Sequence, residues 1–219
     1  MKDEIVIRSD VVHSNRLYVT NGFNIPDWGG ARKQNKMDII RLKQAQVESE
    51  NSNCVKHSVG CIITDIEGKI LSSGYNGTPK GHLNCCAKFP NFKNEVKNSE
   101  TKIEALDMLP EGSWTAARKL LRRQEENKLS ALREEHHLWS KKNENHAEVN
   151  AMLRSDPKAR IGGTIYINLQ PCEECAKMIA GSGISRVVYG KAYERSDKRF
   201  SESFFNASMI KYIHIPDII

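Results

Sequence analysis

The sequence lacks the features that mark several large classes of protein. Among its 219 residues no apolar run is long enough to cross a membrane, and residues 1–4 do not begin a basic-then-apolar secretory signal. Aromatic residues make up only 7% of the chain, and the net charge of +6 is spread thinly, without the basic stripe of a nucleic-acid channel. Internal repeats and low-complexity tracts are absent. We therefore expect a globular, cytoplasmic protein whose partner is neither a membrane nor a nucleic acid.

What the sequence does contain suits a folded domain. Apolar residues account for 39% of the chain and charged residues for 27%, as is usual for a protein with a core. Six cysteines in a reducing compartment are more often metal ligands or buried thiols than three disulfides. One of them, Cys61, lies in an apolar strand pattern and is expected in the core.

Two short segments carry the strongest functional signal. Glu148 follows His146 by two positions, and Cys172 and Cys175 form a Cys-x-x-Cys pair after Pro171. One imidazole and two thiolates make an incomplete tetrahedron around zinc, which leaves a fourth position for water. A nearby carboxylate that is not a ligand is typical of zinc-dependent nucleobase deaminases. Pro171 favours a helix start, where the positive end of the helix dipole stabilises thiolates.

Each segment also has an alternative interpretation. A strand over residues 164–169, followed by Cys172 and Cys175 at a helix start, is also the pattern of a thioredoxin-like redox site. A lone histidine before an apolar helix is usually a packed or surface residue. The joint occurrence of both segments, in the order and separation of a deaminase, favours the zinc site.

The residue types fit one reaction. Zinc lowers the pKa of bound water to about 7, so hydroxide is available near neutral pH. The zinc-bound hydroxide would attack C4 of a cytosine ring. Glu148 would take the water proton, protonate N3 and help the exocyclic amine leave as ammonia.

The hydrophobic patterns predict an α/β fold in which strands alternate with helices, with a mixed sheet of about five strands covered on both faces. An opening helix is expected over residues 37–49, and a hairpin that turns at Gly68 over residues 59–63 and 69–74. Two further helices are expected to begin at His146 and Cys172. The remaining strands are expected over residues 164–169, 186–189 and 210–215.

Together these residues resemble the deoxycytidylate deaminases, most closely the phage type, of the cytidine-deaminase superfamily. The resemblance covers roughly residues 37–194 and is interrupted by one long insertion. Its motifs are Asn53-Cys54 to Val59-Gly60, Gly74-Tyr75-Asn76-Gly77-Thr78-Pro79, Asn84-Cys85-Cys86, His136 with Trp139-Ser140, Lys142 to Ala151, and Pro171 to Tyr193. The resemblance implies the three-layer α/β/α cytidine-deaminase fold and hydrolysis of dCMP to dUMP and ammonia, which supplies the precursor of thymidylate. It also places the protein in the host cytoplasm if the source is a virus.

The resemblance further implies a structural zinc with four ligands: Cys54, Cys85, His136 and Glu144. A metal there would pin the catalytic helix to the loops that carry the two cysteines, and four ligands would leave no reactive water. Alternatively, the thiols are ordinary buried cysteines and the histidine packs beside Trp139. The neighbouring Cys86 and His137 leave the register open by one residue.

For the substrate, the resemblance implies that Asn76 contacts the deoxyribose, that Tyr193 closes the other side of the nucleotide and that Ala147 belongs to the binding site. Without the resemblance, Asn76 before Gly77 is a turn residue that tolerates positive φ, and Tyr193 is a packing residue. A basic cluster after the strand at 186–189 either meets the substrate phosphate or forms a solvated surface loop. Its members are Lys191, Arg195, Lys198 and Arg199.

Regulation is implied by the resemblance alone. Enzymes of this kind are typically hexamers activated by dCTP with Mg²⁺ and inhibited by dTTP, so a homo-oligomer, dCTP and dTTP are the expected partners. The effector would lie at residues 74–79. Pro157, after the catalytic helix, departs from the family pattern near the subunit contact, and this departure argues against effector control.

Two regions depart from the family: an N-terminal extension (residues 1–36) and, within the zinc deaminase domain of residues 37–219, an insertion at about 87–135. One apolar stripe predicts a helix from Ser113 to His136, which must bury against the domain or another subunit. The stripe contains Trp114, Ala117, Leu120, Leu121, Leu129 and Leu132.

Two other functions stay open. The same zinc chemistry could act on dCTP, a modified deoxycytidylate or cytosine in a single strand. The chain could also be a zinc-stabilised binding module without turnover, although the intact Glu148 disfavours this.

Overall fold

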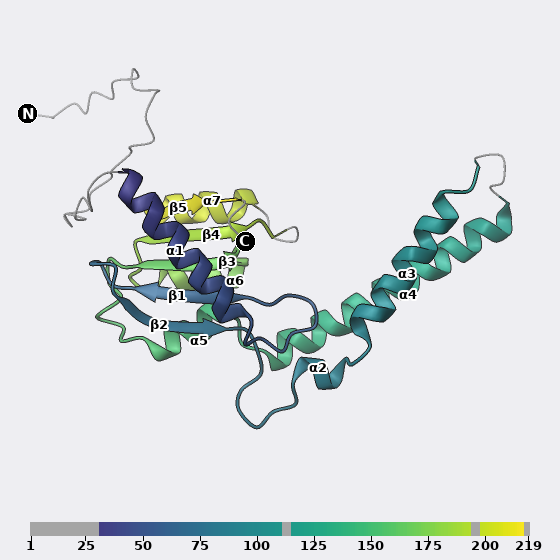
Figure 1. Ribbon diagram of the computed structural model, residues 1–219, viewed down its shortest axis with the longest axis horizontal. Coiled ribbons are helices and arrows are strands. Elements are labelled where there is room, and N and C mark those ends of the chain that lie inside the picture. The colour runs from purple at the N-terminus through teal and green to yellow at the C-terminus, as the bar shows by residue number, and fades with distance from the viewer. Residues whose placement is uncertain (1–30, 111–114, 194–197, 217–219) are drawn as a thin grey trace, which may run out of the picture.

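The computed structural model describes residues 31–110, 115–193 and 198–216, which form one sheet with helices on both faces and a projecting helical hairpin (Figure 1). The elements are α1 (Ala31–Ser49), β1 (Gly60–Thr64), β2 (Ile70–Tyr75), α2 (Cys85–Lys88), α3 (Phe92–Asp107), α4 (Ala116–Asn143), α5 (Ala147–Arg154), β3 (Thr164–Leu169), α6 (Glu173–Ala180), β4 (Arg186–Lys191), α7 (Lys198–Ala207) and β5 (Lys211–His214). None of the helices in the described ranges is both long enough and apolar enough to span a membrane.

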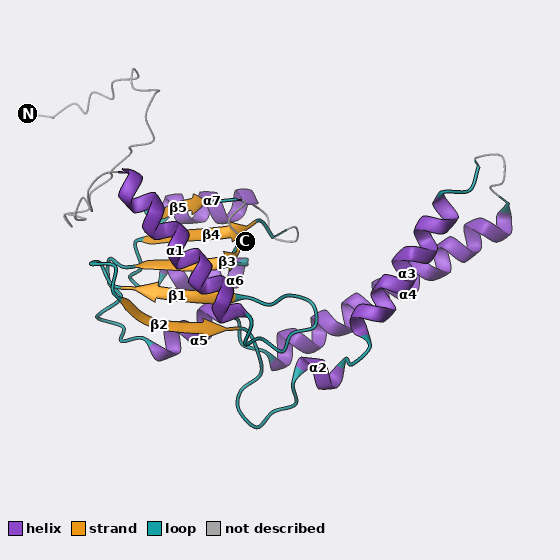
Figure 2. Ribbon diagram, in the orientation of Figure 1, coloured by secondary structure: helices purple, strands orange, loops and turns teal. Residues whose placement is uncertain are grey.

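The strands lie in the order β2-β1-β3-β4-β5 (Figure 2). β1 pairs antiparallel with β2 and β3, whereas β3, β4 and β5 are parallel. Gly68, in the turn between β1 and β2, has a φ of +83°, which glycine adopts without a Cβ clash. Parallel neighbours need a crossover connection, and α6 and α7 provide the two crossovers. The predicted mixed sheet of about five strands is confirmed.

Helices cover both faces of this sheet, as Figure 1 shows. On one face Leu42 and Ala45 of α1 pack on Ile62, Tyr166 and Val188. On the other face α5, α6 and α7 bury the alternate residues of the same strands. This second cluster includes Cys61, Ile63, Ile165, Ile167, Ala151, Ile179, Val187 and Phe205. The arrangement is the expected three-layer α/β/α fold, and Cys61 is a core residue as predicted.

A buried ion pair ties α1 to β4. Arg186 donates hydrogen bonds to both carboxylate oxygens of Asp38, one of them at 2.8 Å, and the Tyr166 hydroxyl donates to the same carboxylate at 3.1 Å. Asp38 is 1% exposed and Arg186 is 9% exposed. Because two charges are desolvated here, their bidentate pairing fixes the position of α1 on the sheet more than it adds stability.

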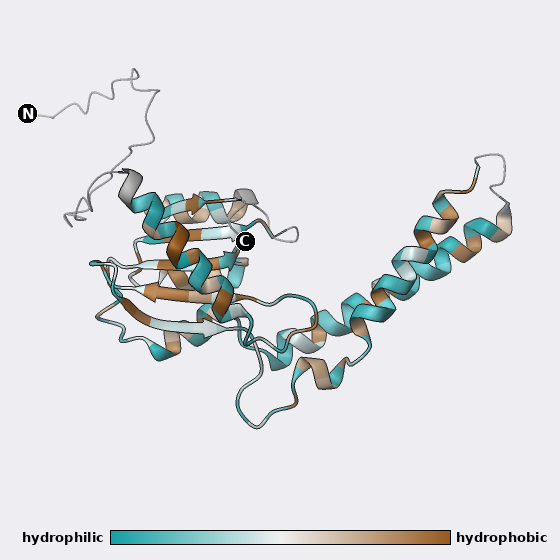
Figure 3. Ribbon diagram, in the orientation of Figure 1, coloured by the Kyte–Doolittle hydropathy of each residue, from teal (hydrophilic) through white to brown (hydrophobic). Residues whose placement is uncertain are grey.

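The insertion is a hairpin of α3 and α4 that projects away from the sheet (Figure 1). Ion pairs join its two helices: Lys102–Glu125 at 2.9 Å, Arg122–Asp107 at 2.8 Å and Arg133–Glu100. Near the far end, the buried Arg118 donates to the carbonyls of Leu109 at 3.0 Å and Pro110 at 3.2 Å, and also to that of Leu106 in the last turn of α3. Figure 3 shows that the hairpin is mainly hydrophilic, in contrast to the strands.

The hairpin differs in three ways from the sequence prediction. The predicted helix is present as α4, but it begins at Ala116, and Ser113 and Trp114 lie outside the described residues. Leu129 is buried, whereas Leu120 and Leu121 are 58% and 54% exposed. The domain therefore covers only part of the apolar stripe. α3, which packs along α4, was not predicted.

The elements of the sheet domain agree with the predictions, with two corrections. α1 begins at Ala31, earlier than the expected start at residue 37. The surface-loop interpretation of the basic cluster is wrong for Lys198 and Arg199, because these residues open α7. Lys191 is exposed at the end of β4, and Arg195 lies outside the described residues.

Candidate metal centre

Two helix starts bring the predicted zinc ligands together. His146 is the N-cap residue of α5, and Cys172 is the N-cap residue of α6, directly after Pro171. Both residues have extended backbones, with ψ of 158° and 170°, so the chain turns sharply into the helix at each of them. Cys175 lies in the first turn of α6 and is buried. The positive ends of two helices therefore converge on one place.

The geometry of these three side chains fits a tetrahedral metal ion. Nδ1 of His146 is 3.2 Å from Sγ of Cys175 and 3.4 Å from Sγ of Cys172, and all three ligand atoms lie within 4.8 Å of one another. Zinc with bonds of about 2.0 Å to nitrogen and about 2.3 Å to sulfur requires nitrogen and sulfur to be roughly 3.5 Å apart. The two cysteines are free thiols, not a disulfide. The position of His146 beside both thiols favours the zinc interpretation over the redox alternative.

Hydrogen bonds within the cluster stabilise one thiolate, that of Cys172. Hydrogen bonds from Cys175 and then from His146 lower the pKa of Cys172 to about 4, while the bond to Cys172 raises the pKa of His146 to about 9. The neighbouring Cys172 thiolate and burial raise the pKa of Cys175. A thiolate is thus present at neutral pH, and a divalent ion would replace the protons that hold the cluster together.

Glu148 lies in the first turn of α5 and is only 3% exposed. Burial raises the pKa of its carboxyl group, and the nearby His146 opposes this shift. A buried carboxyl group beside the ligands is placed to accept and donate a proton there. Ala147, between the two, is fully buried.

A second cluster forms at the base of the hairpin. Nε2 of His136 is 3.3 Å from Sγ of Cys85 and 3.8 Å from Sγ of Cys54, and all three residues are buried. The rings of Phe89 and Phe92 pack on the imidazole, with centroids at 5.2 Å and 4.8 Å. These contacts account for the position of the ring.

The second cluster also carries a stabilised thiolate. Hydrogen bonding from Cys85, with smaller contributions from His136 and from the backbone N–H groups of His57 and Lys56, lowers the pKa of Cys54 to about 3. Backbone N–H groups directed at a thiolate favour its charged form, which is the form that binds metals. Cys85 takes the opposite shift, and its pKa is raised by the Cys54 thiolate and by burial.

Glu144 lies next to this second cluster but outside the three mutually close ligand atoms. Its Oε2 accepts a hydrogen bond from Ser140, and its Oε1 is buried without a hydrogen-bond partner. Burial raises the pKa of Glu144, and the Cys54 thiolate adds to the shift. An orphaned carboxylate oxygen beside two thiols and an imidazole fits a fourth metal ligand. Cys86 and His137, the adjacent alternatives, are both exposed and lie outside the cluster.

Comparison with known proteins decides the family. The model of the family described as "Cytidine and deoxycytidylate deaminase zinc-binding region" matches residues 35–191 of this chain. The chain belongs to this family. It is 34% identical over 180 residues to the deoxycytidylate deaminase of Enterobacteria phage T4, covering 80% of this chain and 88% of that protein. It is 33% identical over 181 residues to the deoxycytidylate deaminase of Enterobacteria phage T2, with coverages of 81% and 91%.

A solved structure shows the same fold. The apo crystal structure of dCMP deaminase from the cyanophage S-TIM5 aligns with a TM-score of 0.51 at 21% identity, and covers 82% of this chain and 98% of that one. The predicted membership of the deaminase family and the predicted fold are both confirmed. The zinc-binding character of the family agrees with the Cys/His/Cys geometry described above.

The residues expected to meet substrate have structural partners. The side chain of Asn76, which is 8% exposed, accepts a hydrogen bond from the Val59 N–H at 2.8 Å and donates to the His57 carbonyl at 2.9 Å. Asn76 does not have positive φ, so its interpretation as a turn residue of that kind is wrong. The backbone N–H of Tyr193 donates to Oε1 of the buried Gln170 at 3.1 Å, and its ring meets that of His57 edge-on. Sequence reasoning missed both Gln170 and His57.

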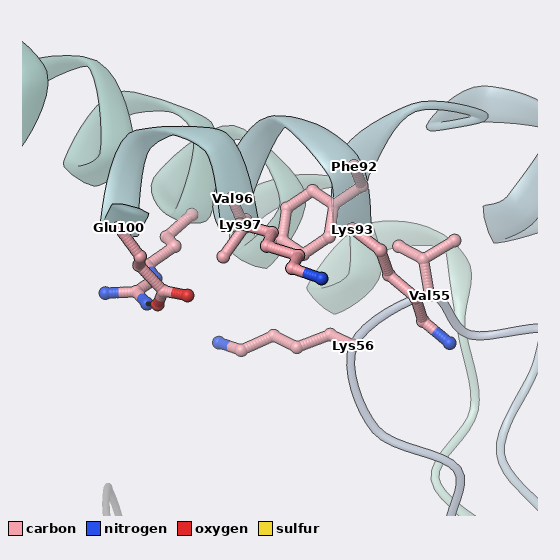
Figure 4. A pocket seen from close by; sticks show the side chains of 8 residues that line it. Val55, Lys56, Phe92, Lys93, Val96, Lys97 and Glu100 are labelled. Atoms are coloured by element: carbon pink, nitrogen blue, oxygen red, sulfur yellow. Dashed lines mark hydrogen bonds and ion pairs between the residues drawn. The ribbon is translucent and has the colours of Figure 1, made fainter. Parts of the chain in front are cut away.

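A shallow concavity of about 270 Å³ lies beside the hairpin, and its lining includes none of His146, Glu148, Cys172 and Cys175 (Figure 4). Val55 and Phe92 form part of its wall, and Lys56 extends across it (Figure 4). Its only acidic lining residue, Glu100, is paired with Arg133.

Proposed function

We propose that the chain is a zinc-dependent enzyme that hydrolyses dCMP to dUMP and ammonia. The observation that carries this proposal is the meeting of one imidazole, two thiols and the buried Glu148 at two helix starts. The identity of 34% to a deoxycytidylate deaminase over most of both chains supports dCMP as the substrate. The product dUMP is the direct precursor of thymidylate, so the proposed role is the supply of that precursor in the cytoplasm.

The ligands proposed for the catalytic zinc are His146, Cys172 and Cys175. When bound, zinc acts as a Lewis acid that lowers the pKa of coordinated water to about 7. The remaining steps belong to Glu148. Its carboxylate takes one proton from the attacking water and delivers it to N3 of the cytosine ring. It then passes the second water proton to the departing amino group, which leaves as ammonia, so water and dCMP are converted to dUMP.

The substrate-binding residues proposed are Asn76, Ala147 and Tyr193. Ala147 is fully buried between His146 and Glu148, so its backbone lies at the reacting end of the site. Asn76 reaches the same region because the next residue, Gly77, exchanges backbone hydrogen bonds with Asn145 at 3.1 and 2.9 Å. Lys191, exposed two residues before Tyr193, is one candidate for the substrate phosphate.

We also propose a second zinc with a structural role, held by Cys54, Cys85, His136 and Glu144. The support is the close packing of the first three ligand atoms, the stabilised Cys54 thiolate and the orphaned oxygen of Glu144. Four protein ligands leave no open position for chemistry. Such an ion would join the hairpin, through His136, to the loop that carries Cys54 and to the start of α2 at Cys85.

The substrate is tested by a panel of four compounds: dCMP, dCTP, deoxycytidine and a short single-stranded oligonucleotide. We expect ammonia release with dCMP to exceed that with the other three. If ammonia were released equally fast or faster from dCTP or the oligonucleotide, that compound would be the substrate instead, and the proposed zinc-dependent deamination would still hold. No release with any of the four would favour the binding module.

Assembly and control are proposed from family membership. A homo-oligomer, with a hexamer as the expected form, and effects of dCTP with Mg²⁺ and of dTTP are tested by running the same panel with and without each nucleotide. Light scattering of the same samples gives the oligomeric state. A rate that neither nucleotide changes would agree with the departure at Pro157.

A further inference from the structure

The imidazole of His57 is exposed and belongs to neither of the two groups of possible metal ligands. His57 lies in the loop between Cys54 and β1. Its ring meets the ring of Tyr193 edge-on, with centroids 5.6 Å apart and planes at 87°. A histidine held against a residue proposed to contact the nucleotide is a candidate for a substrate contact of its own.

Two sets of hydrogen bonds connect His57 to the segment that carries His146. The carbonyl of His57 accepts a hydrogen bond from the Asn76 side chain at 2.9 Å. Gly77 then pairs with Asn145, the residue that precedes His146. The position of His57 is thus set by the same loop that fixes the start of α5.

Further hydrogen bonds connect Tyr193 to the Cys172 side. The N–H of Tyr193 donates to Oε1 of Gln170 at 3.1 Å, and the N–H of Gln170 donates to the carbonyl of Lys191 at 2.8 Å. Gln170 is 2% exposed and precedes Pro171 and Cys172 in the chain. The pair of His57 and Tyr193 is therefore attached to both segments that carry the proposed zinc ligands.

Burial indicates which part of a nucleotide this pair meets. Glu148 is 3% exposed and Ala147 is fully buried, whereas His146 is exposed, so we place the cytosine ring inward, against Glu148. The sugar and phosphate then point outward, toward the exposed His57 and the half-buried Tyr193. An imidazole N–H donates well to a phosphate oxygen, and the adjacent Lys56 adds positive charge to the same loop.

We infer that His57 binds the 5′-phosphate of the nucleotide and so makes the enzyme prefer a nucleotide to a nucleoside. This inference rests on the proposed function, because it assumes that the base reacts beside Glu148. The backbone of His57 serves a different purpose from its ring. Its N–H is directed at Cys54 and its carbonyl accepts from Asn76, and both interactions survive replacement of the side chain.

The test measures ligand binding without turnover. Calorimetric titrations of the zinc-loaded Glu148→Gln enzyme with dCMP and with deoxycytidine are compared with those of the same enzyme carrying His57→Ala or His57→Gln. His137→Ala is the matched control, because His137 is an exposed histidine on α4 outside both clusters. We expect His57→Ala to weaken dCMP binding by about tenfold or more, the loss typical of one hydrogen bond to a charged group. Deoxycytidine binding should stay the same.

Other outcomes of these titrations would overturn the inference. Equal weakening of both ligands by His57→Ala would mean that the ring only supports Tyr193, and unchanged dCMP binding would mean no contact at all. His57→Gln keeps a side-chain N–H donor of similar reach, so it should retain part of the preference for dCMP. A Glu148→Gln enzyme that binds neither ligand, together with a wild-type enzyme that releases no ammonia from dCMP, would overturn the proposed function itself.

Discussion

The position of α5, which carries the proposed proton shuttle Glu148, depends on Gly74, and replacing this glycine should have an effect of defined size. β2 passes so close to α5 that a Cβ at Gly74 would lie 2.5 Å from the Ala147 carbonyl oxygen and 2.5 Å from the Ala151 nitrogen. Ordinary contacts of a Cβ begin at 3.4 Å, and both neighbours are backbone atoms of α5. Gly74→Ala therefore has to move α5, which carries Glu148, by roughly 1 Å, a displacement that can cost about 10²-fold in rate.

The same substitution should also lower stability. Overpacking costs about 1–3 kcal/mol, and each kcal/mol lowers Tm by about 2–4 °C in a chain of this size. The control is Gly181→Ala, because a Cβ there would meet its nearest atoms at 3.8 Å and the backbone φ is −80°. The assays are initial rates of ammonia release from dCMP, zinc content and thermal unfolding. If Gly74→Ala kept the rate and Tm of Gly181→Ala, the argument that close packing of β2 on α5 positions Glu148 would be refuted.

Three further substitutions test other parts of the structure. Asp38→Ala leaves Arg186 buried without its partner and should lower the free energy of unfolding in urea by about 3–5 kcal/mol; a change below 1 kcal/mol would contradict the described ion pair. His136→Ala should reduce the zinc content from about two ions per chain to about one, whereas His137→Ala should leave it unchanged, and equal zinc in both variants would remove the structural site. Arg118→Ala frees three carbonyls near the end of α3, so hydrogen exchange should quicken in the outer part of the hairpin while the rate of deamination holds. A uniform change in exchange across the whole chain would contradict a local role for Arg118.

Sequence patterns predicted the helices and strands that are buried and whose apolar residues recur with a clear period. The strand at Thr164–Leu169 was predicted from its alternation of apolar and polar residues, and the strand at Arg186–Lys191 from the apolar residues at its centre. The ligand motifs coincide with helix starts because His146 and Cys172 are N-cap residues. α3 was missed because few of its residues are buried and because it meets α4 largely through charged pairs. A polar interface between helices leaves no apolar stripe for sequence analysis to detect.

Residues that act through their position were the hardest to predict. His57 is a single histidine in a loop and Gln170 is a single amide after a strand, and neither belongs to a recognisable spacing. Only the folded chain shows that the first meets Tyr193 through its ring and the second through a hydrogen bond to its backbone. The basic cluster was similarly ambiguous, because lysine and arginine are common both in loops and in the first turn of a helix such as α7.

The most direct test of the central claim uses Glu148→Gln, in which the carboxylate is replaced by an amide of nearly the same shape. We expect this variant to bind as much zinc as the wild-type chain, to unfold at a similar temperature and to release no measurable ammonia from dCMP. A variant that still releases ammonia at the wild-type rate would contradict the assignment of Glu148 as the group that moves protons beside the zinc ligands.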